Sequence, residues 1–122
     1  MATFSKIPLS GNSAGMGILI SSGSVGVAGP TIHTGSSSAN VTDEVWIYAV
    51  NYDTTDRKLT MQYGGVVAGT NEIEFTVKAE SGLYLIVPGL LLVGHATPKV
   101  ITAYAATNTS LVVYGYCNRI TS

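Results

Sequence analysis

The sequence predicts an all-β fold, an antiparallel β-sandwich or jelly roll of about eight short strands. Short runs that alternate apolar and polar residues, or that are rich in β-branched and aromatic residues, recur along the 122-residue chain. Clusters of Gly, Asn, Ser and Pro separate these runs and predict turns. No stretch combines an apolar period of about 3.6 residues with helix-capping residues. The length suits a single domain, residues 1–122.

The N-terminal part is rich in Gly and Ser and predicts short, irregular strands. Residues 1–10 alternate apolar and polar side chains, so they form either a first strand or an extended arm that docks on a partner. Because Gly weakens strands and permits bends, only the apolar islands Met16–Ile20 and Val25–Val27 are expected to pair next. Thr31–Thr34 is a further short strand, followed by a flexible loop.

The segment Asp43–Asn51 is the central strand of the prediction, because it is apolar on both faces. Val45 and Ile47 point to one side, and Trp46 and Tyr48 point to the other. A strand with one face in water would instead alternate apolar and polar residues. We therefore expect one face to cover a core and the other to be covered by a second layer or by another chain.

Two later segments share this two-sided apolar character. One is the strand Gly82–Val87, which Pro88 should end, with Leu90–Val93 as a buried turn or an edge strand. The other is Leu111–Ile120, which follows a predicted turn over residues 107–110.

Exposed aromatic residues usually mark contacts between proteins, so the second faces of these strands predict an interface with other copies of the chain or with a partner protein. The alternatives are a thick core, or long loops that cover these faces. The candidate interface residues, which include two from the N-terminal segment, are Phe4, Ile7, Trp46, Tyr48, Tyr84, Tyr114 and Tyr116.

The remaining strands should each have one apolar face and one polar face. Lys58–Tyr63 should turn its apolar residues inward, with Thr60 and Gln62 toward water. Glu72–Lys78 has the clearest alternation, and its glutamates are read as solubilising residues that protect a sheet edge. Lys99–Ala105 completes the set.

The composition favours a protein that works packed against neighbours. Charged residues make up 11% of the chain, against about 25% in an average soluble domain. A free monomer usually keeps a charged surface to stay soluble. The six Lys and Arg residues are scattered and the net charge is -1, so nucleic acid is not expected as a partner. No apolar run is long enough to cross a bilayer and no secretory signal is visible, so a soluble protein made in a reducing cytoplasm is expected.

One short pattern suggests hydrolytic chemistry but lacks its structural context. Residues 11–15 match the nucleophile elbow G-x-S-x-G, and Ser13, Asp43 and His95 follow the hydrolase order of nucleophile, acid and base. The elbow requires a strand, a sharp turn and a helix, and no helix is predicted here. We therefore expect a flexible turn, no catalytic residues and no enzymatic activity.

Two sets of residues have side chains that metals bind. His33 and His95 could bind a metal with Asp43 or Cys117, but two isolated histidines are a weak zinc signal and Cys117 reads as a small buried hydrophobe. The loop aspartates at positions 53 and 56 have oxygen ligands suited to calcium, although turn hydrogen bonds explain them as well. No metal and no cofactor are expected.

Several segments of the chain resemble those of a known group of proteins. They are ATFSKIPLSG, TIHTG, DEVWIYAVN, AESGLYLIVPGLLL and GYCNRI. With them the chain resembles small all-β structural proteins of tailed bacteriophages, and in particular capsid decoration (cement) proteins. The resemblance implies a virion protein, made in the host cytoplasm, that binds the outer surface of the major capsid protein shell and stabilises it. It also implies self-association, with a homotrimer favoured over a homodimer.

A tail or head-fibre module that binds host-surface carbohydrate is the alternative, because sandwich folds host both functions. A sugar site needs an aromatic platform beside polar groups. Trp46 or Tyr52, next to Asn51 and Asp53, would supply them.

Overall fold

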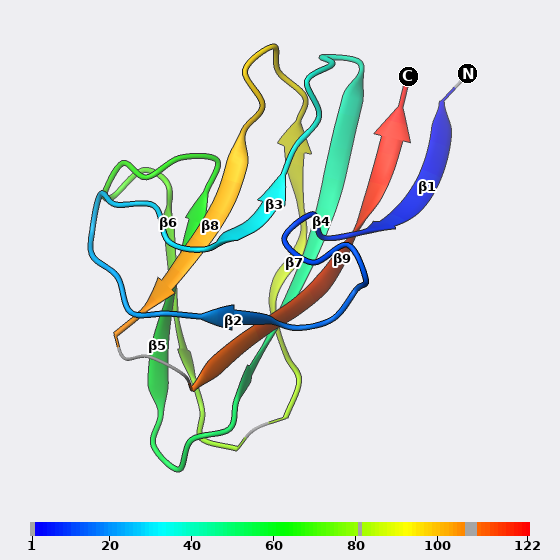
Figure 1. The fold of residues 1–122 in the computed structure, drawn as a ribbon. Coiled ribbons are helices and arrows are strands. Elements are labelled where there is room, and N and C mark those ends of the chain that lie inside the picture. The colour runs from blue at the N-terminus through cyan, green and yellow to red at the C-terminus, as the bar shows by residue number, and fades with distance from the viewer. Residues whose placement is uncertain (1, 81, 107–109) are drawn as a thin grey trace.

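The computed structural model describes residues 2–80, 82–106 and 110–122, and these residues form strands and no helix (Figure 1). None of them therefore forms a helix with the length and apolarity that a membrane crossing needs. The predicted turn over residues 107–110 lies largely outside the described residues. The strands are β1 (Thr3–Pro8), β2 (Ile18–Ile20), β3 (Thr31–Thr34), β4 (Val41–Asn51), β5 (Arg57–Tyr63), β6 (Glu72–Val77), β7 (Tyr84–Val93), β8 (Val100–Ala105) and β9 (Leu111–Thr121).

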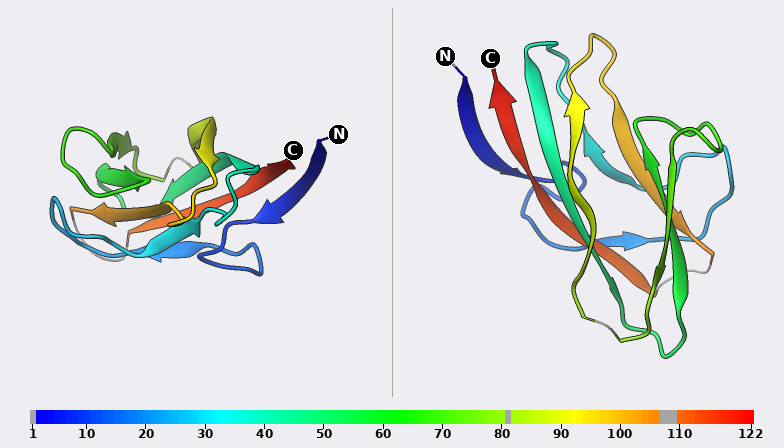
Figure 2. Two further views of the ribbon diagram at one scale, coloured as in Figure 1. Left: turned by 90° about the horizontal axis from the view of Figure 1, so that it is seen from above. Right: turned by 180° about the vertical axis from the view of Figure 1, so that it is seen from behind.

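The strands pair into two antiparallel sheets that pack as a β-sandwich, which confirms the predicted fold class with nine strands instead of about eight. The jelly-roll variant stays a prediction. One sheet has the order β1-β9-β4-β7, with β2 also paired to β9, and the other has the order β3-β8-β5-β6. The left view of Figure 2 shows the two layers from above, and the right view shows β1, β9, β4 and β7 side by side.

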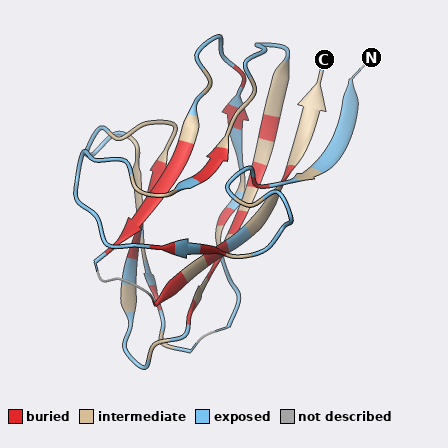
Figure 3. Cartoon of the chain, in the orientation of Figure 1, coloured by how far each residue is buried: buried red, intermediate tan, exposed pale blue. Residues whose placement is uncertain are grey.

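The N-terminal segment lies in the five-stranded sheet as an edge strand. β1 pairs with β9 from Thr3, opposite Thr121, to Pro8, opposite Tyr116. β2 pairs with the other end of β9, opposite Leu111 to Val113. Figure 3 shows that β1 is exposed along most of its length, whereas β8 in the second sheet is buried.

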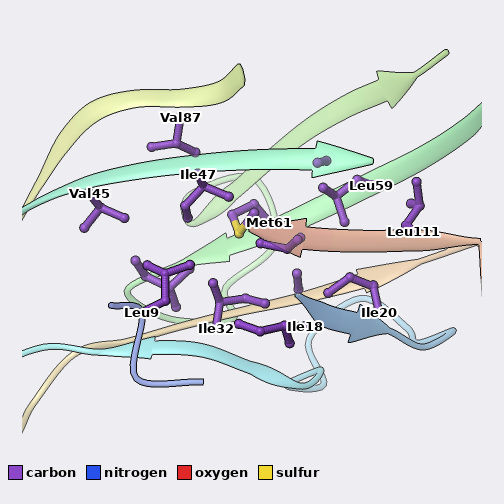
Figure 4. Packing of buried hydrophobic residues seen from close by; sticks show 14 of the residues in the cluster. Leu9, Ile18, Ile20, Ile32, Val45, Ile47, Leu59, Met61, Val87 and Leu111 are labelled. Carbon is purple, nitrogen blue, oxygen red and sulfur yellow. The ribbon is translucent and has the colours of Figure 1, made fainter. Parts of the chain in front are cut away.

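The core fills the space between the two sheets. The inner residues of β4 are fully buried, in the strict alternation that the sequence predicted for this strand. Figure 4 shows core side chains from both sheets, among them Ile47 of β4, Ile32 of β3 and Met61 of β5. The same alternation places the second set of β4 side chains, which includes Trp46, on the outside of the sandwich.

β5 departs from the prediction, because Thr60 and Gln62 are buried and do not face water. Residues 27–29 lie over Gln62 on the outer side of the four-stranded sheet. The Gly29 N–H donates to Gln62 Oε1 at 3.0 Å, and Gln62 Nε2 donates to the Val27 carbonyl at 2.9 Å. Thr102 Oγ1 also donates to Gln62 Oε1, at 2.6 Å. Because Gln62 is polar, the sequence predicted that it faces water. In the structure, backbone groups supply the hydrogen bonds that water would have made.

The prediction of a strand over Val25–Val27 was wrong for a related reason. This stretch forms turns between β2 and β3. The Val27 carbonyl accepts a hydrogen bond from Gln62 and not from a neighbouring strand.

β7 also departs from the prediction, because it continues through Pro88 and Gly89 to Val93. It is the edge strand of its sheet and pairs with β4 alone, so a proline lacking an N–H is tolerated. Two register shifts in the pairing with β4, on either side of Trp46 and Ile47, absorb the irregular backbone.

Candidate functional site

The three strands that are apolar on both faces, β9, β4 and β7, are neighbours in one sheet. Their outward side chains therefore form one continuous surface together with those of β1 and β2, and we call it the outer face. Cross-strand partners lie on the same side of a sheet. The register gives its members as Phe4, Lys6, Pro8, Leu19, Thr42, Glu44, Trp46, Tyr48, Val50, Leu85, Pro88, Leu91, Val93, Val112, Tyr114, Tyr116, Asn118 and Ile120.

Large apolar side chains on the outer face are open to solvent. Phe4 is 72% exposed, Leu91 56% and Val93 55%. At one end the turn that carries Gly17 packs against Val112 and Tyr114. The outside of the other sheet, by contrast, carries an exposed ion pair of Lys58 and Glu74, and its Gln62 is covered by residues 27–29. A contiguous exposed apolar patch of this kind marks an interaction surface.

The centre of the outer face is held in place by polar contacts between neighbouring side chains. The rings of Trp46 and Tyr116 stack with centroids 6.3 Å apart and planes 11° apart. Trp46 Nε1 and Asn118 Nδ2 both donate to Glu44 Oε1, at 2.8 and 2.9 Å. The Lys6 ammonium lies 4.7 Å from the centroid of the Tyr116 ring, within the range of a cation–π contact. These contacts order the side chains before any partner binds, which lowers the entropic cost of binding.

Glu44 is the anion of this group. Hydrogen bonds from Asn118 and Trp46 hold the pKa of its carboxyl below the usual value, so it is charged at neutral pH. Beside it, a shallow hollow of about 320 Å³ is lined by residues that include Phe4, Lys6 and Ile120. The outer face therefore combines aromatic surface with one positive and one negative group.

The structure brings five of the seven candidate interface residues together on the outer face: Phe4, Trp46, Tyr48, Tyr114 and Tyr116. Ile7 is not among them, because it lies on the opposite side of β1 and packs against the core. Tyr84 begins β7 and packs on Phe75 of β6, with centroids 5.2 Å apart. The β7 residues Leu91 and Val93 were missed, because the sequence does not show which strands pair.

A buried polar cluster links the two sheets on the inner side. Asp43 of β4 accepts two hydrogen bonds from Arg119 of β9, Nε to Oδ1 at 2.7 Å and Nη2 to Oδ2 at 2.9 Å. His33 Nε2 of β3 lies 2.7 Å from Asp43 Oδ2. The Ser10 N–H donates to His33 Nδ1 at 3.0 Å, so Nε2 carries the ring hydrogen and donates to Asp43. His33 is therefore the neutral tautomer.

The electrostatics of the cluster follow from this geometry. Burial alone would raise the pKa of Asp43, but hydrogen bonds from Arg119 and His33 outweigh that effect and hold it below its usual value. Burial raises the pKa of the Cys117 thiol to about 12, so this neighbour stays protonated.

His33, Asp43 and Cys117 place one potential ligand atom each within 4.8 Å of one another, as a metal site requires. The hydrogen bonds do not fit that use. Both nitrogens of His33 are engaged, and both oxygens of Asp43 accept from Arg119. The donor chemistry is that of a network tying the N-terminal turn, β3, β4 and β9 together.

The three residues that follow the hydrolase order do not form a relay. Ser13 is exposed in the turn between β1 and β2, and a strand follows this turn where the elbow needs a helix. Asp43 is bound to His33 and Arg119, whereas His95 is exposed and its Nδ1 accepts from the Thr97 N–H at 3.1 Å. The acid and the base of the hydrolase order are therefore bonded to other residues.

The loop aspartates are each engaged by a cation and a backbone N–H. Asp53 accepts from Arg57 and from the Thr54 N–H, and a hydrogen bond from Arg57 is the main cause that lowers the pKa of Asp53. Asp56 accepts from the Ala79 N–H and from Lys78. These contacts explain both carboxylates as turn residues.

The sugar platform does not assemble as predicted. The Asn51 side chain is buried and donates to the carbonyls of Thr55 and Val77, while Tyr52 is exposed in the β4–β5 turn. Trp46 lies on the outer face, away from both, and its polar neighbours are Glu44 and Asn118.

Comparison of the chain with protein-family models, with curated proteins and with solved structures gave no match.

Proposed function

We propose that this chain is a structural protein of a phage virion, a decoration protein that binds the outer surface of the major capsid protein shell and stabilises it. The observation that carries the proposal is the outer face, an ordered and largely apolar surface on one side of a charge-poor sandwich. The resemblance of the sequence to phage decoration proteins supports the choice of partner.

The physical basis of such a function is the burial of apolar surface across the joints between capsid subunits. Each contact gains about 25 cal/mol for every Å² of apolar area removed from water. A shell binds many copies, so modest individual contacts add up to a large stabilisation of the particle. Few charged groups have to be desolvated on this face, because Lys6 and Glu44 are the only charged residues among its members.

The first test is the number of copies in purified virus particles, measured by quantitative mass spectrometry against the major capsid protein. We expect a ratio near one or a simple fraction of it. A handful of copies per particle would instead indicate a tail or fibre component. Absence from the particle contradicts the virion proposal altogether.

Carbohydrate binding by a tail or head-fibre module is the second candidate, favoured by the hollow next to the Trp46–Tyr116 stack. Sugars bind where aromatic faces adjoin polar groups, and Glu44 and Asn118 supply such groups here. Binding to a panel of surface glycans that is lost in Trp46→Ala but kept in Tyr52→Ala would support this function over decoration.

A further inference from the structure

The two charged side chains of the outer face lie in one row across the sheet. Asn118 of β9 pairs with Lys6 of β1 on one side and with Glu44 of β4 on the other. Across the sheet, the row therefore consists of the positive Lys6, the neutral Asn118 and the negative Glu44, with β9 at its centre.

We propose that the β1–β9–β4 part of the outer face binds a second copy of this chain, across a two-fold axis that runs along β9. Such an axis turns one face onto the other and exchanges the positions of β1 and β4. Lys6 of each copy then lies opposite Glu44 of the other, which forms two equivalent ion pairs. An axis across the strands would set Lys6 against Lys6 and Glu44 against Glu44. The charges thus select one symmetry.

Glu44 is prepared for such a contact. Both of its hydrogen bonds within the described chain end on Oε1, so Oε2 is the oxygen that accepts from the Lys6 ammonium of the second copy. The ammonium already lies over the Tyr116 ring, on the same side of the sheet.

The residues of β9 lie on the axis and face their own copies. Tyr114, Tyr116 and Asn118 would therefore form the centre of the interface, with aromatic surface that remains partly exposed in the single chain. The six residues of β1 and the eleven each of β9 and β4, at about 3.4 Å per residue and about 4.8 Å between strands, give roughly 450 Å² of flat surface per copy. The pair then buries about 900 Å², below the roughly 1,000 Å² of a specific interface, so the dimer is a weak one.

This pairing does not depend on the virion function, and it leaves another surface open. β7 lies beyond β4, whereas β1 has no neighbour on its far side within the described chain. The dimer therefore leaves the β7 residues Leu85, Leu91 and Val93 uncovered. A two-fold pairing also favours the homodimer over the homotrimer that the sequence resemblance favoured.

Sedimentation velocity of purified protein over a range of concentrations tests the proposal. The wild type should dimerise reversibly, and Lys6→Glu and Glu44→Lys should each be monomeric, because each sets like charges opposite one another. An equimolar mixture of the two single variants should form a heterodimer, and the double variant should dimerise again. The matched control Lys99→Glu, an exposed residue outside the outer face, should dimerise like the wild type.

Four results would overturn the proposal. A wild type that remains monomeric at the highest soluble concentration excludes the dimer, and a trimer excludes the two-fold axis. A dimer that both single variants keep places the interface elsewhere. Single variants that are folded by circular dichroism but do not pair on mixing exclude the Lys6–Glu44 contact between copies.

Discussion

Asp43 is a buried carboxylate that connects the two sheets through Arg119 on its own sheet and His33 on the other. Because both partners donate to it, the charge is compensated and the burial is tolerated. Loss of the charge would leave the donors of Arg119 and His33 with a poorer acceptor inside the protein.

We predict that Asp43→Asn lowers the free energy of unfolding by about 3 kcal/mol, the typical loss when one partner of a buried pair is removed. Urea denaturation at neutral pH measures this change. Glu80→Gln, an exposed carboxylate in the β6–β7 turn, serves as the control and should leave the midpoint almost unchanged. Equal midpoints for the two variants would contradict a stabilising function of the cluster.

The same cluster predicts how stability depends on pH. The pKa of Asp43 in the folded protein lies below its ordinary value of 3.8, so the folded state binds the proton less readily than the unfolded state. Its contribution is therefore fully present well above that ordinary value and is lost as the pH falls through the lower, folded value. Denaturation curves at decreasing pH should show a steeper loss for the wild type than for Asp43→Asn. Parallel curves would assign the acid sensitivity to other carboxylates.

The sequence predicted part of this cluster. It gave His33, Asp43 and Cys117 as residues that could share a metal, but favoured burial for Cys117 and an ordinary hydrogen bond in a turn for His33, which lies in β3. Arg119 was not anticipated, because it is 76 positions from Asp43 and nothing local shows that β4 pairs with β9. Long-range pairing is a property of the sheet, which alternation along one strand does not reveal.

At the scale of the element, β7 combines two residues that usually end strands. Gly89 has φ +83°, and a Cβ built on it would lie 3.1 Å from Cζ2 of Trp46. Because Gly89 has no side chain, it can adopt a backbone conformation that L residues disfavour. It also leaves room for the indole ring of Trp46.

We predict that Gly89→Ala destabilises the protein more than Gly69→Ala does. Gly69 has φ +78° with open space where its Cβ would lie, so both variants carry a backbone cost of about 1 kcal/mol. The excess at position 89 is the cost of displacing Trp46. Thermal unfolding measures the difference, and the tryptophan fluorescence should change in Gly89→Ala alone. Equal effects on stability and an unchanged emission would mean that Trp46 does not depend on this contact.

Elements with a strong local signal were predictable, and elements defined by their neighbours were not. β3 was predicted with its observed bounds, and β6 within one residue, because alternation and flanking turns mark them. β7 was split at Pro88, since a proline ends an inner strand but not an edge strand. Gln62 was placed in water because the segment that covers it, residues 27–29, carries no sequence signal of its position.

At the scale of the whole molecule, the two outer sides of the sandwich differ in the polarity of the side chains that they present to solvent. On the outside of the four-stranded sheet the backbone of residues 27–29 bonds to Gln62, and Lys58 and Glu74 form an exposed ion pair, whereas the outer face of the five-stranded sheet presents apolar side chains to solvent. The sequence predicted the second apolar faces strand by strand. Their merger into one surface depends on the order β9-β4-β7, which strand patterns do not specify.

This asymmetry leads to a prediction that separates capsid binding from self-association. In the proposed dimer, the β7 residues Leu85, Leu91 and Val93 stay uncovered. We call them the β7 strip, and they are the part of the outer face that a different partner can bind. Leu91→Glu places a charge on this strip, where the side chain is 56% exposed in the free protein, so folding should be little affected. Desolvating an unpaired carboxylate in an apolar contact is costly, so we expect binding to empty capsids to fall at least tenfold.

The matched control is Val67→Glu, at an exposed apolar residue in the β5–β6 loop, 62% exposed and outside the outer face. Cosedimentation of each protein with purified capsids measures binding, and sedimentation velocity of the free proteins measures dimerisation. Leu91→Glu should lose capsid binding and keep the dimer, while Val67→Glu keeps both. If both variants bind capsids like the wild type, the shell contact does not use β7. If Leu91→Glu loses the dimer as well, the two-fold interface extends over β7, and β7 is not a separate surface for the capsid.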